Sequence, residues 1–385
     1  MPLDSTKIHA QTTYHSYLNG IFHLANATAT KIKVMKSMEH YAPHPGSEFE
    51  GYYSKFDLSS GSHIALIICS VPNASTRAHM VSFTYYPKCG SPLFQREHFV
   101  DKIEHMVIDE KTKAFELRVP GLGYMRTQGD GTTAYRLAAN DWRFDAQTET
   151  YTAWRGGGEA SSSTPEGWMM RLPLPLHWHV HSLCSPCAFH LSIPCLGDDA
   201  LSPADHSGRA TCHQEKNWAT SFPDAHMWVQ AWDASTSKGI CLAGGKVLGQ
   251  TAYLLGYRSP TLQLDFGPPF AVAYLDVFAP FMRARVDWAG RSFALSVSKY
   301  WYKVEVKAHA PKERGWFGLA SPFPEGHRAN FCRESFLATI EVRVSERSGW
   351  WPWSGWKAIR SETFDGASLE FAGGYYPERG GSKEE

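Results

Sequence analysis

Apolar and polar residues alternate along several stretches of the chain. In residues 114–119, 300–308 and 336–344 every second side chain is apolar, which is the period of a strand with one buried face. Residues 64–71 are almost continuously apolar, as expected of a strand buried on both faces. Turn residues separate such runs at short intervals, and no long helical period competes. The pattern therefore predicts an all-β fold of the sandwich or barrel type.

Length and composition set the broad organisation. A chain of 385 residues with 43% apolar residues is long enough for two globular domains, each with its own core. Residues 154–167 are rich in Gly and Ser, which is typical of an exposed loop or a lid, and residues 196–209 form a second predicted loop. We place the domain boundary at this second loop, which gives an N-terminal β domain of residues 1–195 and a C-terminal β domain of residues 196–385.

Charge and targeting signals exclude several partner classes. Lys+Arg and Asp+Glu are equal at 38 each, so the molecule as a whole has no electrostatic attraction for nucleic acid. The N-terminus lacks the apolar core of a signal peptide, and no apolar run reaches the about 18 residues that span a bilayer. We therefore expect a cytoplasmic protein that binds no nucleic acid and is a monomer or a weak dimer.

Aromatic residues are unusually frequent, with 14 Trp, 17 Tyr and 21 Phe. Such residues suit the walls of a cavity for a flat or apolar ligand. Residues 350–356 hold four tryptophans in a segment whose Pro and Gly content predicts a loop. An exposed loop of that kind covers a cavity or contacts a partner or a membrane surface, so peripheral membrane contact is a further expectation.

The sequence carries no recognisable cofactor motif. Eight cysteines are spread from Cys69 to Cys332, which is not the pattern of a small disulfide scaffold. Cys184 and Cys187, which follow a run of histidines, have metal-ligand spacing, but the second cysteine pair of a zinc ribbon is missing. A Gly-rich phosphate loop, a Gly-x-Ser-x-Gly elbow and a His-Glu-x-x-His motif are also missing. We expect no metal site and no cofactor, which leaves acid–base and shape chemistry.

Residues 208–232 combine polar and aromatic side chains on predicted strands. Two strand-like runs flank a turn signal at residues 221–224, where Pro fixes φ. Alternation gives the faces of these runs: His213, Glu215 and Asn217 oppose Lys216 and Trp218 on the first, and Trp228 and Gln230 share a face of the second. A carboxylate, an imidazole and an amide beside large aromatics indicate an apolar pocket with a few polar groups. A strand hairpin with a solvated polar face is the alternative.

Two further polar groups are candidates for chemistry. His177, His179 and His181 share a face of a predicted strand, where they can form either a polar pocket wall or a structural element. Glu50 lies among Phe49 and two tyrosines. Burial of a carboxyl group there would raise its pKa and make it an acid, and a hydrogen-bonded structural glutamate is the alternative.

Several of these segments together resemble a known family. Glu215-Lys-Asn-Trp218, followed by Phe222-Pro223 and Trp228-Val-Gln230, resembles the E-K-N-W…FP…W-Q core of tocopherol-cyclase-like proteins. Residues 49–53 are similar to that family's F-E-G-W-Y element with Tyr at position 52, and residues 177–180 and 333–336 follow in the family's order. The resemblance covers about residues 40–375 and implies two lipocalin-like β-barrel or sandwich domains around an apolar cavity. It also implies kinship with lipocalin-like cyclases and Diels–Alderases.

The resemblance implies a cofactor-independent cyclase, and the absence of a transit peptide places it in specialised metabolism. Such an enzyme closes a ring on a prenylated phenol or quinone, or on a polyene, by protonating an alkene. Glu215 or Glu50 is then the expected acid, and His177 or His179 accepts the phenol proton. The expected substrate-binding residues comprise Asn217, Trp218, His179, Trp228, Gln230, Tyr300 and Tyr52, with the aromatic rings stabilising a cation.

Two alternatives remain open. A pericyclase of the lipocalin-like Diels–Alderase type would fold a polyene by the shape of its cavity. A carrier would bind an apolar ligand without changing it, and Lys216 would then form a structural salt bridge with Glu215.

Overall fold

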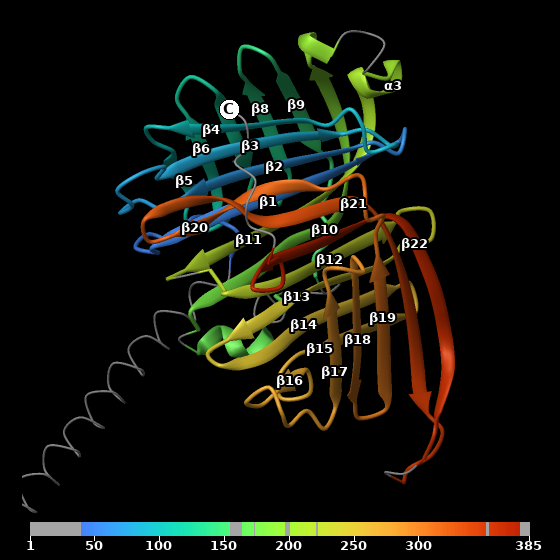
Figure 1. The fold of residues 1–385 in the computed structure, drawn as a ribbon. Helices are drawn as coiled ribbons and strands as arrows, with labels where there is room; N and C mark the ends of the chain where they lie inside the picture. Colours follow the sequence, from blue (N-terminus) through green and yellow to red (C-terminus); the bar gives the residue numbers. More distant parts are fainter. Residues whose placement is uncertain are drawn as a thin grey trace, which may run out of the picture.

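The computed structural model describes residues 40–154, 164–172, 174–196, 201–220, 222–351 and 354–377, without the side chains of residues 168 and 171. Within these residues the chain forms two antiparallel sheets, each with eleven strands, that follow one another along the sequence (Figure 1). The helical segments of the described residues are short: η2 (Gly167–Arg171), η3 (Pro194–Leu196) and α3 (Pro203–His206). The predicted all-β, lipocalin-like fold class is confirmed.

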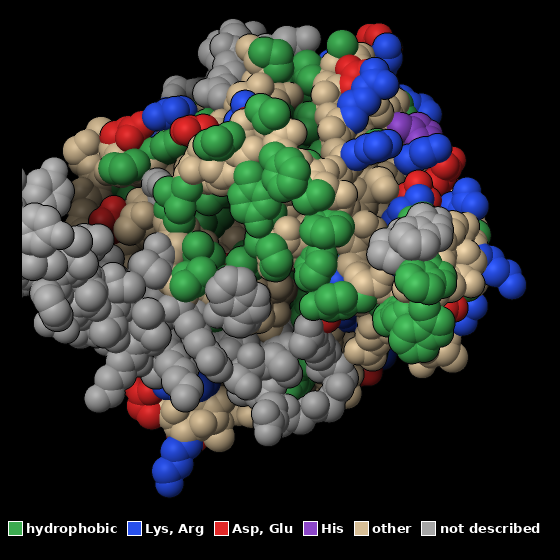
Figure 2. Space-filling view, turned by 90° about the horizontal axis from the view of Figure 1, so that it is seen from below, with side chains coloured by type: hydrophobic (Ala, Val, Ile, Leu, Met, Phe, Trp, Pro, Cys, Tyr) green, Lys and Arg blue, Asp and Glu red, His purple; other side chains and the backbone are tan. Residues whose placement is uncertain are grey.

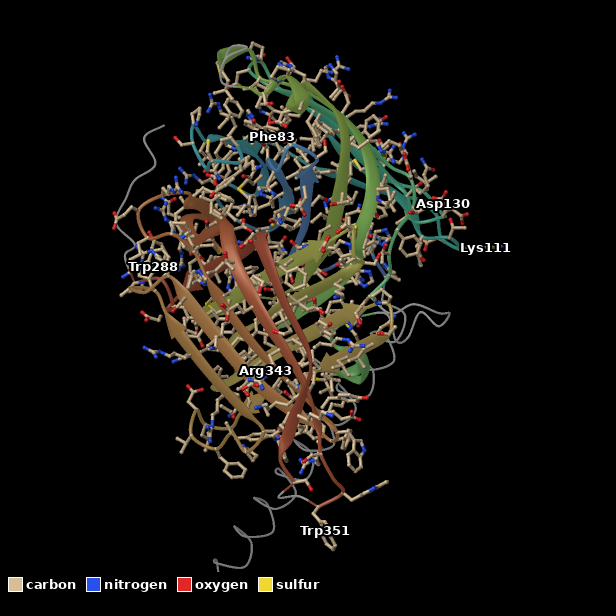
Figure 3. All side chains as sticks on the ribbon, turned by 90° about the vertical axis from the view of Figure 1, so that its right-hand side faces the viewer. Phe83, Lys111, Asp130, Trp288, Arg343 and Trp351 are labelled. Carbon is tan, nitrogen blue, oxygen red and sulfur yellow. The ribbon has the colours of Figure 1, made fainter. Side chains whose placement is uncertain are left out.

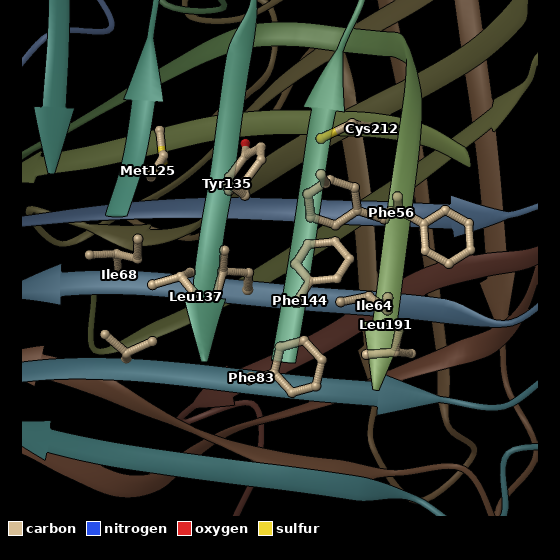
Figure 4. Close-up of a cluster of buried hydrophobic side chains, with 14 of the residues drawn as sticks. Phe56, Ile64, Ile68, Phe83, Met125, Tyr135, Leu137, Phe144, Leu191 and Cys212 are labelled. Atoms are coloured by element: carbon tan, nitrogen blue, oxygen red, sulfur yellow. The ribbon is translucent and has the colours of Figure 1, made fainter. Parts of the chain in front are cut away.

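The first sheet has the strand order β4-β3-β2-β1-β11-β10-β9-β8-β7-β6-β5. Its strands are β1 (Phe49–Leu58), β2 (His63–Ser70), β3 (His79–Tyr86), β4 (Phe94–Val100), β5 (Glu104–Asp109), β6 (Ala114–Val119), β7 (Gly123–Thr127), β8 (Thr133–Ala138), β9 (Arg143–Thr148), β10 (Leu176–Ser192) and β11 (Ser207–Ala219). The sheet curls around a core that includes Phe56, Phe83, Tyr135 and Phe144, whose rings meet in Figure 4.

The second sheet has the order β15-β14-β13-β12-β22-β21-β19-β18-β17, with β16 added to β14 and β20 to β21. Its strands are β12 (Ala225–Asp233), β13 (Lys238–Val247), β14 (Gln250–Ser259), β15 (Leu262–Phe266), β16 (Val272–Ala273), β17 (Met282–Asp287), β18 (Ser292–Lys299), β19 (Tyr302–His309), β20 (Phe317–Phe323), β21 (Gly326–Arg347) and β22 (Trp356–Gly373). A separate core fills this sheet and includes Trp288, which lies far from Phe83 of the first core in Figure 3.

The chain passes from one sheet to the other between Ala219 and Ala225. β11 pairs with β1 and β10, whereas β12 pairs with β13 and β22. The two runs on either side of the predicted turn are therefore strands, but they do not form a hairpin. The change of sheet also comes later than the predicted domain boundary at residues 195 and 196, because β11 completes the first sheet.

The second sheet reaches across to the outer face of the first. β20 and the first part of β21, drawn in orange in Figure 1, lie across β1 to β3. Phe336 on β21 packs against Tyr86 on β3, with ring centroids 5.2 Å apart, and Tyr86 Oη donates to the carbonyl of Gly315 at 2.7 Å. These contacts join the sheets and enclose the space between them.

Other features bear on the sequence predictions. Residues 114–119 form β6 as predicted, and the inward-facing residues predicted for 336–344 are buried in β21. All eight cysteines are free. Among the described helices, none combines the length and the apolar character needed to cross a membrane.

A candidate active site between the two sheets

A cavity of about 260 Å³ lies between the outer faces of the two sheets. The first sheet contributes β1 to β3, β10 and β11, and the second contributes β12 to β14 and β20 to β22, with the η2 segment along one side. Most of the wall is apolar, and its larger side chains are Phe49, Tyr53, Met80, Met169, Trp178, Phe222, Trp228, Tyr253, Leu254 and Leu319. An apolar wall with a few polar groups is the composition of a small-molecule site.

Glu215 is a carboxylate of this cavity wall, on the strand face that the alternation of β11 predicts for it. Tyr53 of β1 is its cross-strand neighbour, so both side chains point to the cavity face of the first sheet. Trp228 Nε1, from the other sheet, donates to Glu215 Oε2 at 3.1 Å, and His213 Nε2 lies 3.0 Å from the same oxygen. Glu215 is 4% exposed, so its charge and hydrogen bonds are largely shielded from water.

A second carboxyl group lies on the facing sheet. Glu334 of β21 and Glu370 of β22 are cross-strand neighbours, and Glu370 lines the cavity. Glu334 is fully buried, and Tyr53 Oη donates to its Oε1 at 3.0 Å. Burial, and after it the negative charge of Glu370, raises the pKa of Glu334 well above its usual range.

The two carboxyl groups of this pair differ in their hydrogen bonds. Glu334 Oε2 is buried and has no hydrogen-bond partner among the described residues, while Glu370 Oε1 lies 2.7 Å from His226 Nε2. A buried carboxylate oxygen without a hydrogen-bond partner is costly to ionise, which also favours the neutral form of Glu334. Glu334 is therefore the carboxyl group that holds its proton to a higher pH than an ordinary glutamate, and its cross-strand neighbour Glu370 lines the cavity.

Two further polar groups complete the wall. The indole Nε1 of Trp178 is a buried donor without a hydrogen-bond partner in the described part of the chain, and Trp178 lines the cavity. Asn217 also lines it, two residues beyond Glu215 on the same face of β11. Both can hold an oxygen atom of a ligand.

Glu50 lies on the opposite face of the first sheet. Its carboxylate is 2.9 Å from Lys216 Nζ and 2.9 Å from His44 Nδ1, and His105 Nδ1 is 3.5 Å away. Burial alone would raise the pKa of Glu50, but Lys216, His105 and His44 hold it well below its usual range. Glu50 is thus a paired carboxylate away from the cavity, which contradicts its predicted role as an acid.

His177, His179 and Trp218 also face away from the cavity. Their cross-strand positions place them with Lys216 on the inner face of the first sheet, because β10 and β11 alternate in register. His177 Nδ1 lies 2.8 Å from Glu166 Oε2, and burial lowers the pKa of His179 well below its usual range, helped by His181 and Lys216. The histidines share a face as predicted, but it is not the cavity face.

Three other predicted binding residues have different places. Tyr300 is 67% exposed in the turn between β18 and β19 and is not one of the residues that line the cavity. Gln230 is buried between the sheets, where Lys55 Nζ donates to its Oε1 at 3.0 Å. Tyr52 contributes to the cavity wall, although its ring packs against Tyr41 and Phe115 in the first core.

The fold of this chain is similar to that of a solved structure. Kievitone hydratase from Nectria haematococca matches with a TM-score of 0.51 and 10% identity, over 88% of this chain and 92% of that one. The two proteins share a fold. A candidate AttH protein from Nitrosomonas europaea has a TM-score of 0.48 at 10% identity, covering 86% and 95% of the two chains. CghA with Sch210972 has a TM-score of 0.44 at 9% identity, covering 84% and 88%.

No family model matches the sequence. The described residues contain two groups whose ligand atoms lie within 4.8 Å of one another and could hold a metal ion. One comprises His213, Glu215 and Cys241, and the other His226, Cys332 and Glu370. Neither includes Cys184 or Cys187, the pair with metal-ligand spacing in the sequence.

Sequence reasoning identified Glu215, Asn217, Trp228 and Tyr52, which line the wall. It missed Tyr53 and Glu370 on the wall, and Glu334 beside Glu370. Both Tyr53 and Glu334 belong to segments that carry the family resemblance, residues 49–53 and 333–336. The alternation of β1 would have separated Tyr53 from Glu50 and Tyr52. The pairing of Glu334 with Glu370 has no such signal, because it depends on a strand pairing across the second sheet.

Proposed function

We propose that this protein is a cyclase that closes a ring on an apolar, unsaturated substrate, such as a prenylated phenol or a polyene, by proton transfer in the cavity. The observation that carries the proposal is the Glu334–Glu370 pair at the wall of an apolar cavity, since alkene protonation needs an acid that stays protonated and is shielded from water. The acid is therefore this pair rather than Glu50.

The reaction moves one proton in and one proton out. The carboxyl pair gives its proton to an alkene carbon, and the neighbouring carbon becomes electron-deficient. The phenol oxygen forms a C–O bond to that carbon and loses its own proton to the Glu215–His213 pair. The product is an isomer of the substrate, so neither a redox cofactor nor a second substrate is required.

Aromatic rings of the wall support the charged intermediate. Tyr53, Trp178 and Trp228 line the cavity, and a desolvated cation over such a ring gains on the order of 2 kcal/mol. These rings take the role that the sequence assigned to Trp218, Trp228 and Tyr300. Trp178 Nε1 and Asn217 hold the substrate oxygen in this account.

Kievitone hydratase, which shares the fold, has a name that implies related chemistry. A hydratase adds water to its substrate, and addition of water to an alkene begins with the same protonation as ring closure. The two outcomes differ in whether water or a hydroxyl group of the substrate captures the cation. A largely apolar wall favours capture by the substrate's own oxygen.

The test uses glutamine variants assayed against a panel of prenylated phenols and polyenes. Glu334→Gln and Glu370→Gln are expected to lower turnover by about 10² to 10⁴, the usual contribution of a general acid, while substrate binding persists. Glu346→Gln is the matched control, because Glu346 is an exposed glutamate of the same strand as Glu334.

Other results would assign the role of the acid to another residue or a different function to the protein. Full turnover in Glu334→Gln and Glu370→Gln, with loss in Glu215→Gln, would return the acid to Glu215. Ring closure that survives all three substitutions would indicate a pericyclase, which works by shape. Ligand recovered bound and unchanged by the wild-type protein would indicate a carrier.

A further inference from the structure

Large hydrophobic side chains are exposed together at one end of the second sheet. Ten of the thirteen exposed large hydrophobics among the described residues lie there: Leu248, Tyr274, Leu275, Val277, Phe278, Phe281, Tyr300, Trp301, Trp350 and Trp351. These ten residues are called the apolar end. Figure 2, which views the molecule from below, shows hydrophobic side chains gathered over the middle of this face and charged side chains toward its margins.

The residues of the apolar end belong to four connections that contact one another. Gln250 Oε1, in the β13–β14 hairpin, accepts from the backbone N–H of Leu275 at 2.6 Å. The ring of Phe270 joins Phe281, at 5.4 Å between centroids, to Tyr300, at 5.0 Å.

The fourth connection lies on the far side of Tyr300. Trp301 packs against Trp350, with ring centroids 4.8 Å apart, and Arg347 Nε donates to the carbonyl of Tyr300 at 3.3 Å. The exposed set is therefore one surface rather than scattered residues, and a contiguous apolar surface of this kind marks an interaction site.

The shape and composition of the apolar end fit a lipid surface. Val277 and Trp350 are each 87% exposed at the tips of connections, and Trp351 projects past the end of the β21–β22 pair in Figure 3. Separate aliphatic and aromatic tips can insert side by side between lipids, and Trp and Tyr favour the boundary between headgroups and acyl chains.

Basic side chains adjoin the apolar tips. Lys299 Nζ lies 5.9 Å from the ring centroid of Phe270 and 6.0 Å from that of Tyr300, and Arg347 stacks 4.8 Å from Trp356. Exposed Lys246 lies near Leu248 and is 3.8 Å from Asp276. Positive groups beside inserted apolar groups are attracted to anionic headgroups, although the chain as a whole has no net charge.

We infer that the apolar end docks on an anionic lipid surface. The β13–β14 hairpin connects this surface to the cavity, because Val247 and Ala252 line the cavity on either side of the exposed Leu248. The cavity wall therefore adjoins the surface that docks on the lipid. Docking is independent of whether the ligand is then converted, so it stands apart from the proposed function.

Vesicle flotation tests this inference without any assay of activity. Full-length protein is expected to float with vesicles of phosphatidylcholine and phosphatidylserine and to float less with phosphatidylcholine alone. The variant carrying Leu275→Ser, Val277→Ser and Phe278→Ser is expected to have an affinity for the mixed vesicles that is lower by at least about tenfold. Ile108→Ser removes a hydrophobic side chain that is 56% exposed on β5 and is expected to bind as the wild type does.

Two results would overturn the inference. One is a wild-type protein that does not bind the vesicles, and the other is a triple variant that floats as well as the wild type. If the unbound wild type self-associates in light scattering and the triple variant is monomeric, the apolar end is a contact between two copies of the chain.

Discussion

The candidate site depends on how individual charges are compensated. Glu50 and Glu334 are both buried, yet the pKa of Glu50 is lowered by Lys216, His105 and His44, whereas burial and Glu370 raise the pKa of Glu334. Lys216 follows Glu215 in the sequence but pairs with Glu50, so the predicted Glu215–Lys216 salt bridge is wrong. Neighbours along a strand point to opposite faces, which is why sequence proximity misleads here.

Glu334→Gln is expected to change how stability depends on pH. The raised pKa of Glu334 means that its neutral form stabilises the fold at acidic pH. That contribution is lost as the pH rises from the usual glutamate value of about 4.3 toward the raised pKa of the folded state. The wild type should therefore lose stability relative to the variant across this range. Urea denaturation at a series of pH values measures the difference.

The control and the neighbouring groups make that measurement specific. Glu346→Gln should shift stability by a constant amount across the same pH range, because Glu346 is exposed. The groups that face Glu334 are Glu370 with His226, Tyr53, Lys55 and Glu215, and all remain in the variant. A difference between wild type and Glu334→Gln that does not vary with pH would contradict the raised pKa of Glu334.

At the scale of elements, alternation predicts which residues share a face but not what that face meets. The alternate residues of 336–344 that were predicted to face inward are buried, yet Phe336 packs against the first sheet while Val342 lies in the second core. The strand β21 changes surroundings along its length, with register shifts between Ser335 and Ala338. The apolar alternation of residues 300–308 predicts that Tyr300 faces inward. Tyr300 instead lies in a turn, with a φ of 52°, so the alternation of the strand does not apply to it.

The crossing of β21 predicts a stability effect at Phe336. Its ring is fully buried against Tyr86 and Phe317, so Phe336→Ala should lower the free energy of unfolding by about 3–5 kcal/mol. Phe278→Ala is the matched control, since that ring is 65% exposed and its loss should change stability by about 0.5 kcal/mol or less. Equal effects of the two substitutions in denaturant titrations would contradict the docking of β21 on the first sheet.

For the whole molecule, segments far apart in the sequence meet in one place. Tyr53, Glu215, Trp228 and Glu334 come from three motifs of the family resemblance. They join across the two sheets through the hydrogen bonds of Tyr53 to Glu334 and of Trp228 to Glu215. The all-β class and the cavity face of β11 follow from periodicity alone. The facing carboxyl pair does not, because it requires knowing which strands of the second sheet are neighbours.

The most direct test of proton-driven ring closure is to incubate the protein with prenylated phenols in deuterated water and to analyse the products by mass spectrometry. We expect a ring-closed product with one deuterium on carbon, delivered by the exchanged Glu334–Glu370 pair, and about a hundredfold less of it or lower still from Glu334→Gln. A ring-closed product without deuterium on carbon would contradict the account, because it would form without protonation of the alkene.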